Sequence, residues 1–255
     1  MPDFRLSDVE AGEIASVLTL VVTTQPSSAT TFHAKRLSAF AADKARALLT
    51  EKLSCLGCHR LGDQGGQIAP DLAEVRVRLQ PRYVYGMISN PRASNPHTIM
   101  PRIPLLPDTT ELLANFLLQQ ELPLQPTSSL SPLENPLIPF ANDRALATSK
   151  PSTADQYLAH CAACHGNEGR GDGFNARFLR RTPTAHADAA YMSARPDDSL
   201  YDAVASGGAI MNKSHFMPPW GGTLMPGEIK DLVAYMRTLC RCQEPVWASD
   251  GEGRQ

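Results

Sequence analysis

Two short runs of the sequence combine residue types that bind metals and form covalent bonds with cofactors. Each run has two cysteines three positions apart and a histidine directly after the second, in Cys55-Leu56-Gly57-Cys58-His59 and Cys161-Ala162-Ala163-Cys164-His165. Two thiols on one helical turn can both bond to the vinyl groups of one porphyrin, and the histidine is then held under the iron as its proximal ligand. The pattern C-x-x-C-H, present twice, therefore indicates two sites of covalent haem attachment.

A thioredoxin-like redox pair and half of a zinc site are the competing interpretations of such cysteines. A redox pair needs neither the histidine nor a second copy of the pattern. A zinc site would need its four ligands brought together from separate parts of the chain. The repeated five-residue pattern favours haem attachment over both alternatives.

With these motifs, the chain resembles tandem class I bacterial cytochromes c over residues 40–120 and 150–240. The resemblance implies an all-α fold of two cytochrome c-like helical haem domains joined by a Pro-rich linker. In each domain of this family, a first helix runs into the C-x-x-C-H motif, a loop supplies a methionine, and a final helix packs across the first. The implied cofactors are two covalently bound haem c groups with their iron.

Two of the eight methionines are suited to be sixth ligands of the haem irons. Met100 and Met217 each lie in a loop, precede a proline and are followed by an expected helix. Proline stiffens such a loop and removes a backbone donor, and a thioether suits the low-spin iron of an electron carrier. We therefore predict His59 and Met100 as the iron ligands of one site, and His165 and Met217 as those of the other. Nearby alternatives stay open at Met211, Met225, His97 and His215.

Further residues are candidates for supporting roles at the haem sites. Pro70 matches the family's proline whose carbonyl accepts the free N–H of the proximal histidine and orients its ring, and Pro183 is the expected counterpart in the second domain. Arg78 and Arg180 are candidate partners for haem propionates, with solvated surface arginines as the alternative. Trp220, three residues after Met217, is a candidate contact for a haem edge.

Helical periodicity and turn residues divide the chain into domains and linkers. Helices are expected over 38–54, from a capping-box-like start at 108–111, from a start at 152–155, over 197–205 and over 226–239, and no strand-like alternation appears. Residues 123–139 hold five prolines among serines and threonines, which is typical of a linker. The expected divisions are 1–22 (remnant helix of a preceding cytochrome c-like domain), 23–37 (linker), 38–122 (first cytochrome c domain), 123–149 (Pro-rich linker), 150–245 (second cytochrome c domain) and 246–255 (tail).

The first 22 residues resemble the end of a haem domain whose front half is missing. Met1-Pro2 is followed by a helical pattern, as are Met100-Pro101 and Met217-Pro218, so this unit occurs three times whereas C-x-x-C-H occurs twice. Haem c is attached outside the cytoplasmic membrane in bacteria, yet no signal peptide is present. We therefore expect a longer natural gene with an export signal upstream, and a periplasmic protein. A true start with an accidental match is the alternative.

Cys240 and Cys242 follow the last expected helix. A disulfide across a single intervening residue is strained, and the other cysteines belong to the haem motifs. Unpaired thiols without a function are therefore expected here, with an intermolecular disulfide or metal ligation as alternatives.

Composition limits the classes of function. The net charge is −2 with 20% charged residues and no basic run, so nucleic acid is not an expected partner. No stretch approaches the roughly 20 apolar residues of a transmembrane segment. Hydrophobic residues make up 42% of the chain, which is enough for a packed core.

These features predict an electron-transfer protein of the respiratory chain, with redox protein partners as electron donor and acceptor and with no catalytic residues. Such a protein sets the haem potential, buries the macrocycle and exposes one edge to its partners. It would act as a free carrier or as part of a larger membrane respiratory complex. A dihaem redox enzyme of the peroxidase or thiosulfate dehydrogenase type is the alternative, and it would need an open sixth position or a cysteine ligand at one iron.

Overall fold

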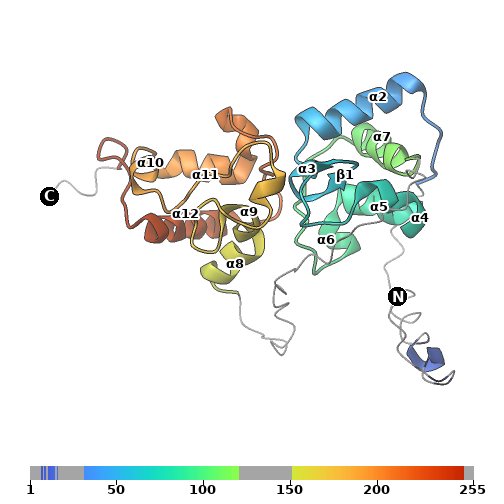
Figure 1. The fold of residues 1–255 in the computed structure, drawn as a ribbon, viewed down its shortest axis with the longest axis horizontal. Helices are drawn as coiled ribbons and strands as arrows, with labels where there is room; N and C mark the ends of the chain where they lie inside the picture. The colour runs from blue at the N-terminus through green and yellow to red at the C-terminus, as the bar shows by residue number, and fades with distance from the viewer. Residues whose placement is uncertain are drawn as a thin grey trace.

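The computed structural model describes residues 32–120 and 151–249, together with residues 7, 9, 11–14 and 16. The linker predicted at 123–149 and most of the segments predicted at 1–22 and 23–37 lie outside the described residues. The two long described segments form two helical lobes, each around its own buried cluster (Figure 1). We call residues 32–120 the first lobe and residues 151–249 the second lobe.

The first lobe consists of helices, short π or 3-10 turns and one small hairpin. In chain order these are α2 (Ala39–Ala47), η1 (Leu48–Lys52), α3 (Cys55–Cys58), β1 (Arg60–Leu61), β2 (Gln64–Gly65), η2 (Leu72–Glu74), α4 (Val75–Arg78), α5 (Pro81–Ser89), α6 (Pro91–Ser94) and α7 (Pro107–Leu117). The helix predicted over 38–54 is present as α2 and the π-turn η1. Ser38 caps it, because its Oγ accepts a hydrogen bond from the amide of Ala41 (3.3 Å).

Helices α2, α5 and α7 enclose the core of the first lobe. The side chains of Ala45, Leu49, Leu56 and Leu113 are at most 1% exposed, and full burial of a leucine side chain contributes about 1.5–3 kcal/mol. Leu56 lies inside the first C-x-x-C-H motif, so the core anchors the motif itself. The capping box predicted at 108–111 is wrong, because α7 begins one residue earlier with Pro107 in its first turn and no side-chain cap.

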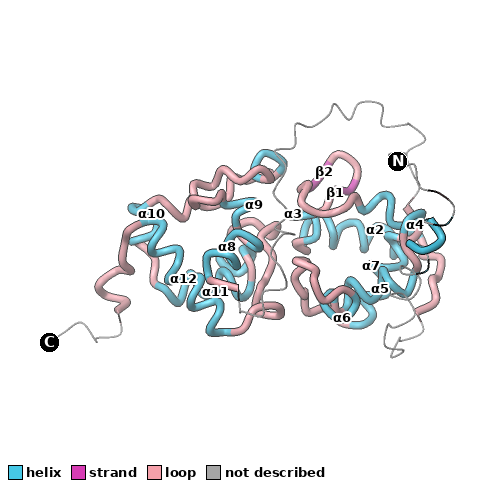
Figure 2. The backbone as a smooth tube through the Cα atoms, turned by 90° about the horizontal axis from the view of Figure 1, so that it is seen from below, coloured by secondary structure: helices cyan, strands magenta, loops and turns pink. Residues whose placement is uncertain are grey.

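A two-stranded antiparallel hairpin directly after the first motif departs from the all-α prediction. It pairs Arg60 with Gly65 and Leu61 with Gln64 (Figure 2). Gly62 (φ 64°) supplies the left-handed turn residue between the strands. Strands of two residues are too short to show alternation in a sequence, so periodicity could not reveal them.

The second lobe is built from helices and two 3-10 turns. They are α8 (Thr153–His160), α9 (Ala162–His165), η3 (Ala176–Phe178), α10 (Ala189–Ser193), α11 (Asp197–Ser206), η4 (Gly208–Met211) and α12 (Pro226–Cys240). The helix start predicted at 152–155 is present with its capping box, in which Ser152 and Asp155 bond to each other's backbone amides. The helix predicted over 197–205 is present as α11, and Gly207 (φ 86°) ends it.

Helix α12 closes the second lobe by packing on α8, α10 and α11. Four of its apolar side chains are at most 4% exposed, namely Ile229, Leu232, Val233 and Met236. The side chain of Gln156 on α8 also donates to the carboxylate of Glu228 on α12 (3.0 Å). Among the described residues, no helix combines the length and the apolar character that crossing a membrane requires.

The cap at Ser152 gives a test of how the second lobe begins. Replacing Ser152 with Ala removes the oxygen that accepts a hydrogen bond from the amide of Asp155 (3.2 Å), so the free energy of unfolding should fall by about 1 kcal/mol. Ser152→Thr keeps an acceptor oxygen and is the matched control, which should retain most of that stability. Urea unfolding of the full chain followed by circular dichroism measures both, and an equal loss in the two variants would contradict the cap.

Candidate functional site

The first C-x-x-C-H motif forms a single helical turn followed at once by extended backbone. Helix α3 carries Cys55 and Cys58, and His59 follows as its C-terminal cap in an extended conformation (φ −91°, ψ 154°). The amide of His59 donates to the carbonyl of Cys55 (2.9 Å), which closes the turn. Two thiols and an imidazole therefore occupy one compact turn.

A loop eleven residues further along the chain holds the imidazole of His59. Nδ1 of His59 lies 2.7 Å from the carbonyl oxygen of Pro70, the acceptor expected from the sequence. Since a carbonyl only accepts, Nδ1 carries the proton and the lone pair of Nε2 is left for a metal. Burial lowers the pKa of His59, against the opposing effects of Pro70 and Asp71, so the ring is neutral, as a metal ligand must be.

An ion pair that the sequence reasoning missed connects the residue after His59 to the residue after Pro70. Nε and Nη2 of Arg60 donate to Oδ2 of Asp71 (2.9 and 2.7 Å). Arg60 directly follows His59 and Asp71 directly follows Pro70, and this adjacency was the only signal that could have revealed the pair. This ion pair fixes the loop that presents the acceptor carbonyl.

The two predicted iron ligands of the first lobe line the same apolar cavity. His59, Met100 and Cys55 all line this cavity. The remaining lining side chains are apolar, namely Leu49, Leu72, Ile88, Pro101, Ile103, Leu105, Leu113 and Leu117. An imidazole, a thioether and a thiol surrounded by apolar side chains are what a covalently held, His/Met-ligated haem requires, so these residues fit that group.

The second motif repeats the local geometry of the first with one difference. Cys161 ends α8, and α9 carries Cys164 and His165. Nδ1 of His165 lies 2.8 Å from the carbonyl oxygen of Thr184, so the predicted acceptor Pro183 is wrong by one residue. The carbonyl of Pro183 lies instead against Gly171, where a Cβ would come within 2.6 Å of its oxygen.

A second histidine, His186, packs directly against His165. The two rings are nearly parallel, with centroids 4.1 Å apart and planes inclined by 14°. Nδ1 of His186 lies 3.0 Å from the hydroxyl of the fully buried Tyr157. Burial, together with the neighbouring His165 and Lys213, holds the pKa of His186 well below its usual value, so this imidazole is neutral. No spacing in the sequence pointed to His186 or Tyr157.

Two glycines let the loop with Met217 approach the end of α11. A Cβ at Gly207 would lie 2.9 Å from the carbonyl oxygen of Met217, and one at Gly208 would lie 3.0 Å from the Cβ of Met217. The amide of Gly208 donates to the Met217 carbonyl (3.1 Å). Met217 and Cys161 pack against the same buried cluster of the second lobe.

Trp220 lies beside the second motif. Its side chain is buried, and its ring centroid is 4.8 Å from that of His160, the residue before Cys161. Nδ1 of His160 is buried and has no hydrogen-bond partner among the described residues. A polar nitrogen in this position is available to a group bound at the motif.

The other residues considered as haem contacts or iron ligands are paired with other groups or exposed. Arg78, predicted to meet a haem propionate, pairs with Glu74 (3.2 Å) on the exposed surface of α4. Nη2 of Arg180 donates to the side chain of Gln64 (3.2 Å). Met225 is 68% exposed at the start of α12. Nε2 of His215 lies 3.3 Å from the carbonyl oxygen of Thr50.

The protonation of the motif thiols bears on the competing interpretations. Burial raises the pKa of Cys55 to about 11 and that of Cys161 to about 12. It also raises the pKa of Cys58 to about 12, with further contributions from Cys164 and Cys55. Redox-active C-x-x-C pairs depend on a lowered thiol pKa, so the environment of these thiols is opposite to that of a redox pair. Within the described residues, no three or more His, Cys, Asp or Glu side chains are grouped so as to hold a metal ion by themselves.

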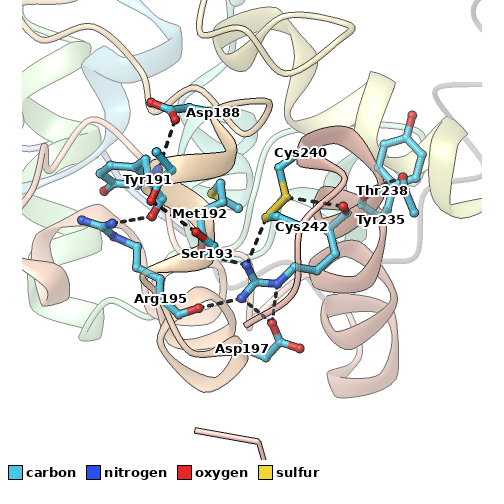
Figure 3. Close-up of a disulfide and its surroundings, with 12 residues drawn as sticks. Asp188, Tyr191, Met192, Ser193, Arg195, Asp197, Tyr235, Thr238, Cys240 and Cys242 are labelled. Carbon is cyan, nitrogen blue, oxygen red and sulfur yellow. Dashed lines mark hydrogen bonds and ion pairs between the residues drawn. A yellow bond between two sulfur atoms is a disulfide. The ribbon is translucent and has the colours of Figure 1, made fainter. Parts of the chain in front are cut away.

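Cys240 and Cys242 form a disulfide, which corrects the prediction of unpaired thiols (Figure 3). Arg241 between them adopts a left-handed conformation (φ 51°) that allows their Cα atoms to lie 5.2 Å apart. Arg237 lies beside the disulfide, with Nη1 3.7 Å from Sγ of Cys242, and its Nε donates to Asp197 at the start of α11 (2.8 Å). Arg237 therefore joins the end of α12 to the start of α11, directly beside the disulfide.

One stretch of the chain matches a known protein family. Residues 150–236 match the family model described as Cytochrome C oxidase, cbb3-type, subunit III. This match supports a c-type cytochrome with covalently bound haem and a general function in electron transfer. The matched stretch contains the second C-x-x-C-H motif, Met217 and Trp220. No match was found among the curated proteins or among the solved structures.

The pairing of the cysteines can be counted directly. In the chain produced without haem and denatured with excess alkylating reagent, four of the six cysteines should react, because Cys240 and Cys242 are in a disulfide. Reduction before alkylation should raise the number to all six. In the control variant Cys242→Ser, all remaining cysteines should react with or without reduction. Mass spectrometry of the intact chain gives these counts, and six adducts without reductant would rule out the disulfide.

Proposed function

We propose that this chain is an electron-transfer dihaem c-type cytochrome, which relays single electrons between respiratory redox partners through two His/Met-ligated haems. The observation that carries the proposal is that His59, Met100 and Cys55 all line the same apolar cavity. The family match over 150–236 supports haem electron transfer in the second lobe. Bound haem supplies a one-electron iron couple at each site, and the protein supplies ligands, burial and orientation.

The residues of the first site have separate roles in this proposal. Cys55 and Cys58 would hold the porphyrin through thioether bonds, and His59 would present Nε2 to the iron, while the carbonyl of Pro70 accepts the hydrogen bond from Nδ1. Met100 would supply a thioether ligand to the iron from its proline-stiffened loop. The apolar side chains of the cavity keep water from the iron, which together with a thioether ligand favours a high reduction potential.

The second site uses Cys161, Cys164, His165 and Met217 in the same roles. Thr184 takes the place of Pro70 as the acceptor for Nδ1. The ring of His186 holds the proximal histidine from one face. The donor set thus repeats while the surroundings differ, which supports a relay between two sites of different potential.

The setting that we propose is the periplasm, with an electron donor and an electron acceptor protein as partners. The Cys240–Cys242 disulfide supports an oxidising compartment. The description of the matched family, an oxidase subunit, supports association with a membrane respiratory complex as one setting for this relay. The net charge of −2 provides no strong field to steer one class of partner.

Haem attachment at both motifs is the first expectation to check. In the chain exported with haem maturation, haem quantification against protein mass should give two haems per chain. Unreduced alkylation should then label none of the cysteines, because the four motif thiols are thioethers and the other two form the disulfide. One haem per chain, with two reactive cysteines in the empty motif, would disprove the dihaem proposal.

The methionine ligands are testable with matched substitutions. Met100→Leu and Met217→Leu should each remove about half of the sulfur-to-iron charge-transfer absorption and lower the midpoint potential of one haem, because the thioether is lost. Met236→Leu is the control, because it changes a buried packing methionine at similar volume, and it should keep the absorption and both potentials. A variant at 100 or 217 with unchanged absorption would exclude that ligand. A high-spin band in the parent protein would favour the enzyme alternative.

A further inference from the structure

The two C-x-x-C-H motifs meet at the interface between the lobes. Helices α3 and α9 lie on the facing edges of the two lobes (Figures 1 and 2). The side chain of Asn175, which is 0% exposed, lies between them. Its Nδ2 donates to the carbonyl of Gly57 within the first motif (2.9 Å) and to Sγ of Cys164 within the second (3.2 Å). Its Oδ1 accepts a hydrogen bond from the amide of Gln67 in the first lobe (2.8 Å).

The side-chain amide of Asn175 is used on both sides, as a donor through Nδ2 and as an acceptor through Oδ1. An asparagine side chain offers two N–H donors and a carbonyl acceptor. Both donors and the acceptor of Asn175 have partners, and two of these partners lie in the other lobe. Because the group is buried, losing the side chain would leave the Gly57 carbonyl and the Gln67 amide without partners where water does not replace them.

The backbones of the lobes approach closely at the same place. A Cβ at Gly57 would lie 2.0 Å from the carbonyl oxygen of Phe216, so only glycine fits there. The side chain of Phe216 is buried in the cluster of the first lobe, although Phe216 directly precedes Met217 of the second. The loop that carries the second predicted methionine is thus anchored in the core of the first lobe.

The loop of the first predicted methionine contacts the second lobe in turn. The amide of Arg102, two residues after Met100, donates to Oγ1 of Thr223 (2.8 Å). Nη1 of Arg92 donates to the carbonyl of the same threonine (3.1 Å). Both methionine loops and both attachment motifs therefore take part in one continuous interface.

We propose that Asn175 is a positioning residue that locks the two attachment turns against each other, so that this interface, and not the linker at 123–149, sets the spacing of the two haem sites. The proposal deepens the proposed function, since it assigns to Asn175 the geometry on which an internal relay depends. The contact itself joins protein atoms, so it can be tested apart from electron transfer.

The test uses the haem-loaded full chain with a protease site introduced in the linker. After cleavage, the two halves of the parent should stay together in size-exclusion chromatography at micromolar concentration. Asn175→Leu, which cannot bond to Gly57 or Gln67, should raise the dissociation constant of the halves by roughly tenfold or more. Gln64→Ala is the control, because it removes an exposed contact to Arg180 at the same interface, and it should change the constant by less than about twofold.

Pulsed electron paramagnetic resonance on the uncleaved chain tests positioning in a way that a general loss of stability would not mimic. The distribution of distances between the two oxidised irons should be narrow in the parent and in Gln64→Ala, and broad in Asn175→Leu, with unchanged haem content and optical spectra. A distribution in Asn175→Leu as narrow as in the parent, or halves of the parent that separate on cleavage, would overturn the proposal.

A second variant keeps the test decisive if Asn175→Leu folds poorly. Gly57→Ala leaves Asn175 intact but places a Cβ against the backbone of Phe216, so it should also separate the halves and broaden the distance distribution. Gly227→Ala, with no neighbouring atom within 4 Å of the added Cβ, is its control. If the chain binds one haem and its halves still stay together through Asn175, the dihaem function is disproved. The positioning role of Asn175 at the interface is then still supported.

Discussion

The hydrogen bond from the histidine Nδ1 of each C-x-x-C-H motif to a backbone carbonyl is the constraint around which each lobe is arranged. It is made to Pro70 in the first lobe (2.7 Å) and to Thr184 in the second (2.8 Å). The bond fixes both the tautomer and the direction of the ring, so the loop that delivers the carbonyl must itself be rigid. The pair of Arg60 with Asp71 provides this rigidity in the first lobe. In the second lobe, two backbone hydrogen bonds do the same. The amide of Gly171 donates to the carbonyl of His165 (2.7 Å), and the amide of Ala187 donates to the carbonyl of Gly169 (2.8 Å).

The two imidazoles share a donor role but differ in surroundings. His59 faces a cavity lined by apolar side chains and Met100, whereas His165 lies against the neutral, buried ring of His186. Burial lowers the pKa of both His59 and His165, so both rings are neutral and able to bind a metal. Reduction potentials of haem proteins depend on burial and on contacts beyond the ligands. In the proposed relay, the same ligand set in unequal surroundings would give the two sites different potentials, which favours an ordered path of electrons.

What could be predicted from the sequence was local. The helices that begin at Thr153, after the cap Ser152, and at Pro226 follow from caps and from 3.6-residue periodicity, which neighbouring residues determine by themselves. The hairpin at 60–65 was missed because strands of two residues are too short to show the alternation of apolar and polar residues that identifies a strand. The choice of Thr184 over Pro183 depends on how Gly171 meets the loop, and the Cys240–Cys242 disulfide depends on the left-handed backbone of Arg241. These features are set by contacts and backbone conformations that no spacing rule records. The segments at 1–22 and 123–149 lie largely or wholly outside the described residues, so their predicted roles stay predictions.

The interface also explains why two copies of one motif are not interchangeable. The third position of the motif is Gly57 in the first copy and Ala163 in the second. At Gly57 the backbone of Phe216 leaves no room for a Cβ, whereas Ala163 keeps its Cβ and offers its carbonyl to the amide of Asn175 (2.9 Å). The same asparagine thus contacts both copies, the first through its side chain alone and the second through both its backbone amide and its side chain. A pair of independent domains on a linker would place no such demand on the residue between two cysteines, so the difference between glycine and alanine here is a mark of the packing between the lobes.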